Sequence, residues 1–382
     1  MMNIRNFLLC VALMGVVCCT PGSKANASDN AEADSARIAD STYHITLLFA
    51  GDLMQHTKQI TVGKKADGTY DYSGCFQYMK DEIERADVAI ANFETTLAGP
   101  PYTGYPQFCS PDQFLVDSKN AGFDIMLTAN NHVCDRYSKG IERTIHVMDS
   151  LGVPHLGSYV NAQEREKKYP FLLEKNGFRI VLLNYTYATN GIPTRKPNVV
   201  NYIDKKQIEA DIAKAKTMNA DAIIACMHWG VEYTLKPVTE QRELANWLFK
   251  QGVTHIIGGH PHVVEPMEVR ADAKGDKHVL VYSLGNFISN MTKPNTTGGM
   301  TVRLELTKHH GKTTLANSDY SLYFVSRGDV NGRGQFIVYP ASTPDSQLNA
   351  HERAVKKQFT EAARAMYKRD NKNVQERQIP LK

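Results

Sequence analysis

Six side chains that can bind divalent metal ions follow short apolar runs in this sequence. They comprise two carboxylates, one carboxamide and three imidazoles, which in chain order are Asp52, Glu94, Asn131, His228, His260 and His262. This mixture of oxygen and nitrogen donors suits Mn, Zn or Fe better than Ca or Mg. Because a bound ion acidifies water and polarises a scissile group, the set predicts a hydrolase-type centre with two divalent metal ions.

Two of the imidazoles form a His-x-His pair. His260 and His262 flank Pro261 and follow Gly258 and Gly259. The glycines give the backbone freedom and the proline restrains it, so both rings can be aimed at one point. We therefore expect this pair to serve one centre.

Each metal-binding candidate lies at the end of a predicted buried strand. The strand-like runs are 44–50, 87–91, 123–128, 221–227 and 253–257, and helical patterns between them cover 76–86, 113–121, 138–151, 205–218 and 239–251. Strand, polar loop and helix in alternation are typical of an α/β domain, in which ligand-binding groups gather at the carboxyl ends of the strands. The five polar clusters are therefore expected to converge.

The pattern changes after His262. Strand-like runs follow at 278–288, 299–306, 318–326 and 334–339, and a hairpin pattern joins 171–173 to 178–184 around Asn176-Gly177. We expect these strands to form a second sheet or layer packed on the first. Residues 350–367 predict a terminal helix, and the polar, basic segment 368–382 predicts a frayed end.

The N-terminus resembles an export signal. A short basic start precedes the apolar run 7–19, which is shorter than the roughly 20 residues that a membrane-spanning helix needs. Two processing outcomes fit equally: cleavage after Ala25-Asn26-Ala27, or a lipoprotein anchored through Cys18 or Cys19. Both predict a periplasmic or cell-envelope location. The predicted organisation is a signal at 1–27, a flexible tether at 28–42, a main domain at 43–345 and a C-terminal helix with a basic tail at 346–382.

Composition and charge limit the classes of protein to which this chain can belong. The 382 residues are 42% hydrophobic and 22% charged, enough to bury a large core. A net charge of +4 without a dense basic block before the C-terminal end argues against a nucleic-acid surface, and membrane contact is expected only through the lipid anchor. Cys75, Cys109, Cys134 and Cys226 form no CxxC pair and predict isolated thiols, with one disulfide left open.

Several short segments in a fixed order carry a family resemblance. They are Gly51-Asp52, Asn92-Phe93-Glu94, Ala129-Asn130-Asn131-His132, His228-Trp229-Gly230-Val231-Glu232-Tyr233, Gly259-His260-Pro261-His262-Val263 and Tyr282-Ser283-Leu284-Gly285-Asn286-Phe287. Over residues 44–288 the chain resembles the CapA family of poly-γ-glutamate capsule synthesis proteins. That family is similar to the calcineurin-like metallophosphoesterases. The resemblance implies a four-layer α/β/β/α sandwich.

The resemblance also implies roles for single residues. Asp52 stands at the first phosphoesterase motif, Glu94 at the position of a bridging carboxylate, and Asn131, His228, His260 and His262 at the remaining ligand positions. His132 would act as a general acid or transition-state donor. Met54 stands where the first motif, D-x-H, has its histidine, which leaves one ion a ligand short.

Other residues have both a functional and a structural interpretation. Glu232 and Tyr233 follow His228 closely and predict substrate contacts or a simple turn; Arg195 and Lys196 predict an anion-binding loop or a solvated one. Asp52 taken alone fits a turn and Asn131 a helix cap. His255, inside a strand pattern, predicts a core histidine with its hydrogen bonds satisfied.

The resemblance implies a cell-envelope protein that acts in synthesis, export or processing of an anionic capsule-type polymer such as poly-γ-glutamate, with other envelope or capsule-synthesis proteins as partners. Whether the chain turns over a substrate stays open; a catalytic protein would hydrolyse a phosphoester or amide bond. One alternative is a non-catalytic polymer-binding or scaffold subunit that keeps the fold. Another is a metallophosphoesterase with a phosphoester substrate unrelated to capsule.

Overall fold

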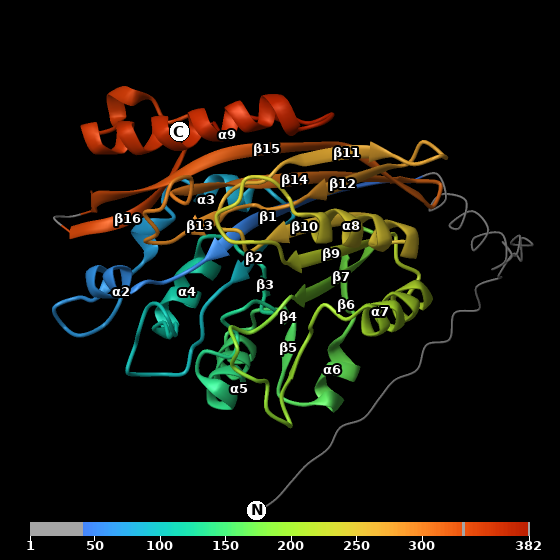
Figure 1. The fold of residues 1–382 in the computed structure, drawn as a ribbon, viewed down its shortest axis with the longest axis horizontal. Coiled ribbons are helices and arrows are strands. Elements are labelled where there is room, and N and C mark those ends of the chain that lie inside the picture. The colour runs from blue at the N-terminus through green and yellow to red at the C-terminus, as the bar shows by residue number, and fades with distance from the viewer. Residues whose placement is uncertain (1–40, 331–332, 381–382) are drawn as a thin grey trace, which may run out of the picture. The chain divides into compact units, whose positions relative to one another are not determined.

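Two packed β-sheets form the centre of the molecule (Figure 1). The computed structural model describes residues 41–330 and 333–380. The predicted signal and almost all of the predicted tether lie outside the described residues. From Thr42 onward the chain forms one unit.

The first sheet has β1 near its middle. Its order is β16-β15-β14-β1-β2-β3-β4, with β13 beside β1 and β17 beside β15. The strands are β1 (Thr42–Leu53), β2 (Val88–Phe93), β3 (Ile125–Leu127), β4 (His155–Leu156), β13 (Asn286–Ile288), β14 (Gly298–His309), β15 (Lys312–Val330), β16 (Arg333–Pro340) and β17 (Gln375–Glu376). β1 runs parallel to β2 and antiparallel to β14.

The second sheet has the order β11-β12-β10-β9-β7-β6. Its strands are β6 (Phe171–Lys175), β7 (Phe178–Thr186), β9 (Ala222–His228), β10 (His255–Gly259), β11 (Met267–Ala271) and β12 (Lys277–Val281). A separate short pair joins β5 (Ser158–Tyr159) to β8 (Val199–Val200). β7, β9, β10 and β12 are parallel neighbours, which explains why their sequences read as nearly continuous apolar runs.

The division of strands between the sheets differs from the sequence-based expectation. β1, β2 and β3 lie in the first sheet, whereas β9 and β10 lie in the second. The late strands β14 to β16 extend the first sheet and the hairpin β6–β7 joins the second, so the prediction that they form a sheet of their own is wrong. The reason is edge pairing: β14 supplies backbone partners to β1 from Thr42 to Phe49, an edge that would otherwise be left open.

Alternation along β1 separates two cores. Leu47 and Phe49 belong to the core shared with the second sheet. Leu48 and Ala50 point the other way and belong to the core formed with α3 (Lys80–Glu84), α4 (Asp112–Asn120) and α5 (Tyr137–Ser150). Helices α7 (Lys205–Thr217) and α8 (Thr239–Gln251) bury Ile208 and other apolar residues against the second sheet. The layers are therefore helix, sheet, sheet and helix, which is the predicted α/β/β/α sandwich.

The helices largely follow the predicted periodicity. Their bounds are α2 (Thr57–Gly63), α3 (Lys80–Glu84), α4 (Asp112–Asn120), α5 (Tyr137–Ser150), α6 (Ala162–Lys168), α7 (Lys205–Thr217), α8 (Thr239–Gln251) and α9 (Ala350–Asp370), with short 3-10 turns at Ser73–Cys75 and Asp345–Gln347. α2 and α6 were not predicted, and α3 covers only part of the predicted helix 76–86. Among the described helices, none is long and apolar enough to cross a membrane.

The C-terminal segment is part of the fold. α9 packs on β15, where the rings of Tyr320 and Tyr367 are 4.8 Å apart, centroid to centroid. Beyond it β17 pairs with β15, and the Arg377 guanidinium contacts the carboxylate of Glu82. Ile379 is buried. The prediction of a frayed end is therefore wrong as far as residue 380, because the tail alternates apolar residues with paired charges.

All four cysteines within the described residues are free and buried. This agrees with the prediction of isolated thiols.

Candidate metal centre

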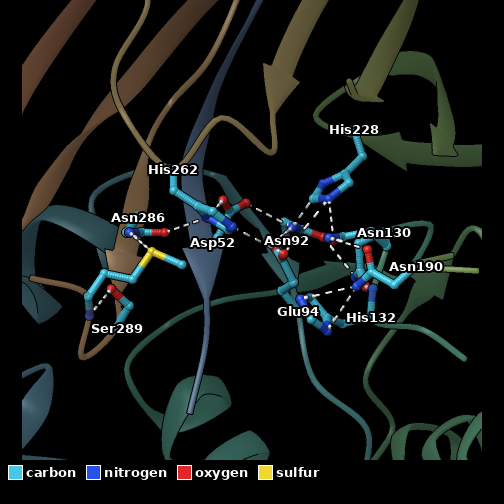
Figure 2. A network of polar contacts seen from close by, with 12 residues as sticks. Asp52, Asn92, Glu94, Asn130, His132, Asn190, His228, His262, Asn286 and Ser289 are labelled. Carbon is cyan, nitrogen blue, oxygen red and sulfur yellow. Dashed lines mark hydrogen bonds and ion pairs between the residues drawn. The ribbon is translucent and has the colours of Figure 1, made fainter. Parts of the chain in front are cut away.

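The carboxyl ends of strands from both sheets meet at one place. Asp52 pairs in register with Asn92 across β1 and β2, and His228 pairs with Gly259 across β9 and β10. Figure 2 shows the side chains of Asp52, Asn92, Glu94, His228 and His262 directed toward one another in a continuous polar network. The convergence predicted from the sequence is therefore present in the structure, and it spans both sheets.

Two carboxylates form the most deeply buried part of this network. Asp52 and Glu94 are both completely buried. The amide Nδ2 of Asn92 donates to Asp52 Oδ1 at 2.8 Å and to Glu94 Oε2 at 2.9 Å. Burial raises the pKa of the Glu94 carboxyl well above its ordinary value, and the nearby Asp52 carboxylate adds to the rise. A cation at this place would reverse that effect by favouring the ionised form.

His262 links the carboxylates to an amide that orients its ring. Its Nδ1 lies 2.9 Å from Asn286 Oδ1 and 3.2 Å from Asp52 Oδ2, whereas its Nε2 lies 3.9 Å from Glu94 Oε1. Asn286 is itself held by donation from its Nδ2 to the Thr296 carbonyl at 3.0 Å. Metal-binding histidines usually have such a partner on the other ring nitrogen, which fixes the ring and its tautomer.

His228 and Asn131 form a second part of the network. His228 Nε2 lies 2.8 Å from Asn131 Oδ1 and 3.8 Å from Glu94 Oε1. Asn131 also donates from Nδ2 to Asn190 Oδ1 at 3.2 Å. Burial lowers the pKa of His228 well below its ordinary value, and the neighbouring His260 adds to the shift. The ring is therefore neutral at physiological pH, the form in which imidazole binds metal ions.

His260 lies in a strained turn beside His228. Its ring centroid is 4.8 Å from that of His228 and 4.5 Å from that of Tyr187. The φ angles are +99° at His260 and +58° at His262, in the left-handed region. Such conformations cost on the order of 1–3 kcal/mol and cluster at functional sites. Burial lowers the pKa of His260 to about 3.

The carboxylate of Asp135 positions the His132 ring. Its Nδ1 lies 2.7 Å from Asp135 Oδ2, and the same oxygen accepts the backbone N–H of Phe108 at 2.6 Å. The His132 ring packs edge-on against the Phe108 ring at 4.5 Å. Nδ1 is engaged by Asp135, whereas Nε2 has a longer contact of 3.5 Å with Asn190 Nδ2.

The donor set fits divalent cations. Two groups of three side chains have potential ligand atoms that all lie within 4.8 Å of one another: Asp52 with Glu94 and His262, and Glu232 with His260 and His262. Glu94 Oε1 and His260 Nδ1 are buried and have no hydrogen-bond partner within the described residues. Native structures rarely leave buried polar atoms unpaired, and a bound ion would pair both.

We call the buried set the floor and the more exposed set the rim. The floor comprises Asp52, Asn92, Glu94, Asn131, His228, His260 and His262, and each of its side chains is at most 7% exposed. The rim comprises the remaining predicted substrate-contacting residues, Glu232, Tyr233, Arg195 and Lys196.

The rim residues do not all reach the floor. Glu232 and Tyr233 lie on the loop between β9 and α8 and are partly exposed, and the Tyr233 ring centroid is 6.2 Å from that of His262. Arg195 and Lys196 are exposed, and none of the described contacts joins them to the floor. From the same loop, Asn190 reaches Asn131 instead.

Sequence reasoning missed five residues that contact the site. They are Asn92, Asp135, Tyr187, Asn190 and Asn286. Asn92 and Asn286 belong to segments already singled out, and the place of Asn92 at the end of an apolar run was the signal that would have identified it. Tyr187 and Asn190 follow β7, whose end carries no recognisable metal-binding motif.

Comparison with known families identifies the chain. The family model described as bacterial capsule synthesis protein PGA_cap matches residues 46–291, a range that contains the whole floor. The chain belongs to this bacterial capsule synthesis family.

Curated relatives of this family member include two Bacillus proteins. The capsule biosynthesis protein CapA of Bacillus anthracis is 26% identical over 257 residues, which cover 64% of this chain and 59% of that protein. The PGA biosynthesis protein CapA of Bacillus subtilis is 27% identical over 274 residues, covering 68% of this chain and 67% of that protein. The match thus spans less than two thirds of the Bacillus anthracis relative.

Two solved structures illustrate what this chain is similar to. The Haemophilus influenzae NAD nucleotidase has a TM-score of 0.47 at 11% identity, with 87% of this chain and 64% of that chain covered. The calcineurin-like phosphoesterase YfkN from Bacillus subtilis has a TM-score of 0.44 at 13% identity, with 85% and 98% covered.

Proposed function

We propose that this capsule-synthesis family member is a cell-envelope, metal-dependent hydrolase-type protein that acts in the synthesis, export or processing of an anionic polymer such as poly-γ-glutamate. The PGA biosynthesis relative supports the polymer, and the floor supports the chemistry. The reaction is hydrolysis of a phosphoester or amide bond.

The pair of unpartnered buried atoms on the floor carries this proposal. Glu94 Oε1 and His260 Nδ1 lack hydrogen bonds among the described residues although their side chains are buried. An unsatisfied buried polar group costs roughly 1–3 kcal/mol. Both atoms are good metal donors, so a bound ion would remove this free-energy cost and stabilise the folded protein.

The floor residues divide into donors for two ions. Asp52, Glu94 and His262 would hold one, and Asn131, His228 and His260 would hold the other together with Glu94. Ions of this class acidify water and polarise the scissile group. The Asn92 amide orients the two carboxylates by donating to both.

His132 would move the proton that hydrolysis requires. Asp135 holds Nδ1, so Nε2 can donate to the departing oxygen or nitrogen. The buried Asp135 carboxylate also stabilises the charged imidazolium before donation. A positioned acid of this kind contributes about 10²–10⁴-fold to turnover.

The test is a substrate panel with purified full-length protein. Phosphomonoesters, phosphodiesters and γ-glutamyl amides are incubated with the metal-free protein and added Mn²⁺ or Zn²⁺. We expect turnover of at least one class, lost in Asp52→Asn and kept in Asp67→Asn, a matched change at an exposed aspartate. Cleavage of phosphoesters without any interaction with poly-γ-glutamate would instead indicate a phosphoesterase unrelated to capsule.

The metal claim has a separate readout. Purified protein should contain more than half an ion per chain by elemental analysis, and His260→Ala should lower that content. A metal content below this level that is unchanged in the variant would contradict the proposal.

A non-catalytic scaffold is the second candidate, and Met54 favours it. This side chain is completely buried near the floor and offers only a thioether, a poor ligand for Mn or Zn. A protein that binds poly-γ-glutamate and two ions but turns over none of the panel would fit the scaffold.

A further inference from the structure

Glu232 lies closer to the metal-binding histidines than a substrate-contacting residue needs to. One of its carboxylate oxygens and one nitrogen from each of His260 and His262 all lie within 4.8 Å of one another. The second donor group, Asp52 with Glu94 and His262, shares His262 with it. The two groups are therefore adjacent.

The backbone fixes the position of Glu232. The loop leaves β9 through Gly230, whose φ is +90°, and Tyr233 also has a positive φ of +68°. The Tyr233 N–H donates to the carbonyl of Pro261 at 2.8 Å. Because Pro261 stands between His260 and His262, this bond ties the loop carrying Glu232 to the turn carrying both imidazoles.

Two further carboxylates share the site of Glu232. Glu94 and Asp52 are completely buried carboxylates on the same site. Three carboxylates that converge beside two imidazoles are best balanced by divalent ions, and His260 Nδ1 still lacks a hydrogen-bond partner within the described residues.

We propose that Glu232 is a metal ligand, which supplies to the centre a carboxylate that lies within 4.8 Å of donor nitrogens from both His260 and His262. It thereby compensates for Met54, which offers no oxygen or nitrogen donor from β1. This assignment rests on the proposed metal-dependent function and changes the role of Glu232 from a substrate contact to a part of the centre. Glu232 is also the most exposed of the donors, since it lies on a loop rather than at a strand end.

The consequence is that the loop between β9 and α8 gains a further attachment to the site when metal binds. Lys293 Nζ lies 3.6 Å from the ring centroid of Tyr233, the residue next to Glu232. Ion binding at Glu232 therefore also holds the Tyr233 ring and the Lys293 ammonium at the edge of the floor. The ammonium, as a cation, is suited to contact an anionic polymer.

The experiment measures metal affinity rather than activity. Mn²⁺ is titrated by calorimetry into the metal-free full-length protein, its Glu232→Gln variant, and Glu240→Gln as a matched change at an exposed glutamate in the first turn of α8. We expect two ions per chain in the parent and in Glu240→Gln. In Glu232→Gln, one of the two should bind at least about tenfold more weakly.

A second variant guards against indirect effects. Glu232→Asp keeps a carboxylate on a shorter side chain and should retain more affinity than Glu232→Gln. The metal-free melting temperatures of both variants should match the parent, while the rise on adding Mn²⁺ should be smaller in Glu232→Gln.

The outcomes separate this inference from the function on which it rests. If the parent binds two ions and both variants bind them equally well, Glu232 is not a ligand but the hydrolase-type centre stands. If the parent binds no ion, the proposed function fails and the assignment of Glu232 fails with it.

Discussion

The floor and the rim lie side by side but are built by different means. Floor residues are buried and lie at the ends of strands or in the loops that follow them, and hydrogen-bonded register sets the positions of Asp52, Asn92 and His228. Rim residues come from two loops and are partly or fully exposed. The difference teaches that the chemistry is fixed by the sheets, whereas contacts with a substrate are left to segments that can adapt. Glu232 lies at the boundary between the two.

The largest effect should come from the residue common to both donor groups. His262→Ala removes a donor from each and leaves Asp52 without its ring partner. Loss of outer contacts costs about 10–100-fold in metal affinity, so loss of this ligand should exceed about 100-fold and abolish turnover. Calorimetric Mn²⁺ titration measures it. His146→Ala, at an exposed histidine of α5, is the control, and equal loss in both variants would contradict a distinct floor.

The next contrast separates proton transfer from metal binding within the site. His132→Ala should lower turnover about 10²–10⁴-fold and leave the ion content unchanged. Asp135→Asn should have a smaller effect and shift the pH profile, because it alters only the partner of Nδ1. Steady-state kinetics with parallel elemental analysis provide the measurement. Loss of metal in His132→Ala would make His132 part of the floor.

A buried histidine outside the site provides a reference for those of the floor. His255 accepts the Val279 N–H on Nδ1 at 3.1 Å, as predicted for a core histidine, and burial lowers its pKa to about 3. Because the folded-state pKa lies below the ordinary value near 6.5, the neutral ring contributes stability above pH 6.5 that is lost as the pH falls toward 3.

His255→Gln removes this proton uptake and keeps an acceptor for Val279. Between pH 6.5 and 3 the free energy of unfolding of the metal-free variant should fall less steeply than in the parent, by up to about 1.4 kcal/mol per pH unit. Urea unfolding at several pH values measures the slope. Identical slopes would show that His255 protonates without cost.

The smallest effects belong to the outer rim. Arg195→Ala and Lys196→Ala should each raise KM for an anionic polymer fragment about two- to fivefold, since exposed ion pairs contribute about 0.2–1 kcal/mol. Added salt should remove the difference. Lys167→Ala, at an exposed position of α6, controls for net charge. A change in metal affinity in either rim variant would show that the rim takes part in metal binding and is not distinct from the floor.

The sequence predicted the floor better than it predicted the rim and its surroundings. Apolar runs ending in polar residues indicated the strands, and strand ends meet by geometry, so Asp52, His228 and His262 could be brought together from the sequence. The partition into two sheets could not, because the pairing of β1 with β14 joins residues more than 250 positions apart. The neighbours of Glu232 depend on a backbone hydrogen bond between two loops, from the Tyr233 N–H to the Pro261 carbonyl. No pattern of side chains in the sequence indicates such a bond.

The assembly of the floor from both sheets has a mechanical consequence. Asp52 and Asn92 belong to one sheet, while His228 and the turn after β10 belong to the other. An ion held between them would link the two sheets of the sandwich. At a free ion concentration 100 times its Kd, it would add about 2.7 kcal/mol to the free energy of unfolding. Selection for stability of the fold would thus preserve these ligands even in a lineage without catalysis.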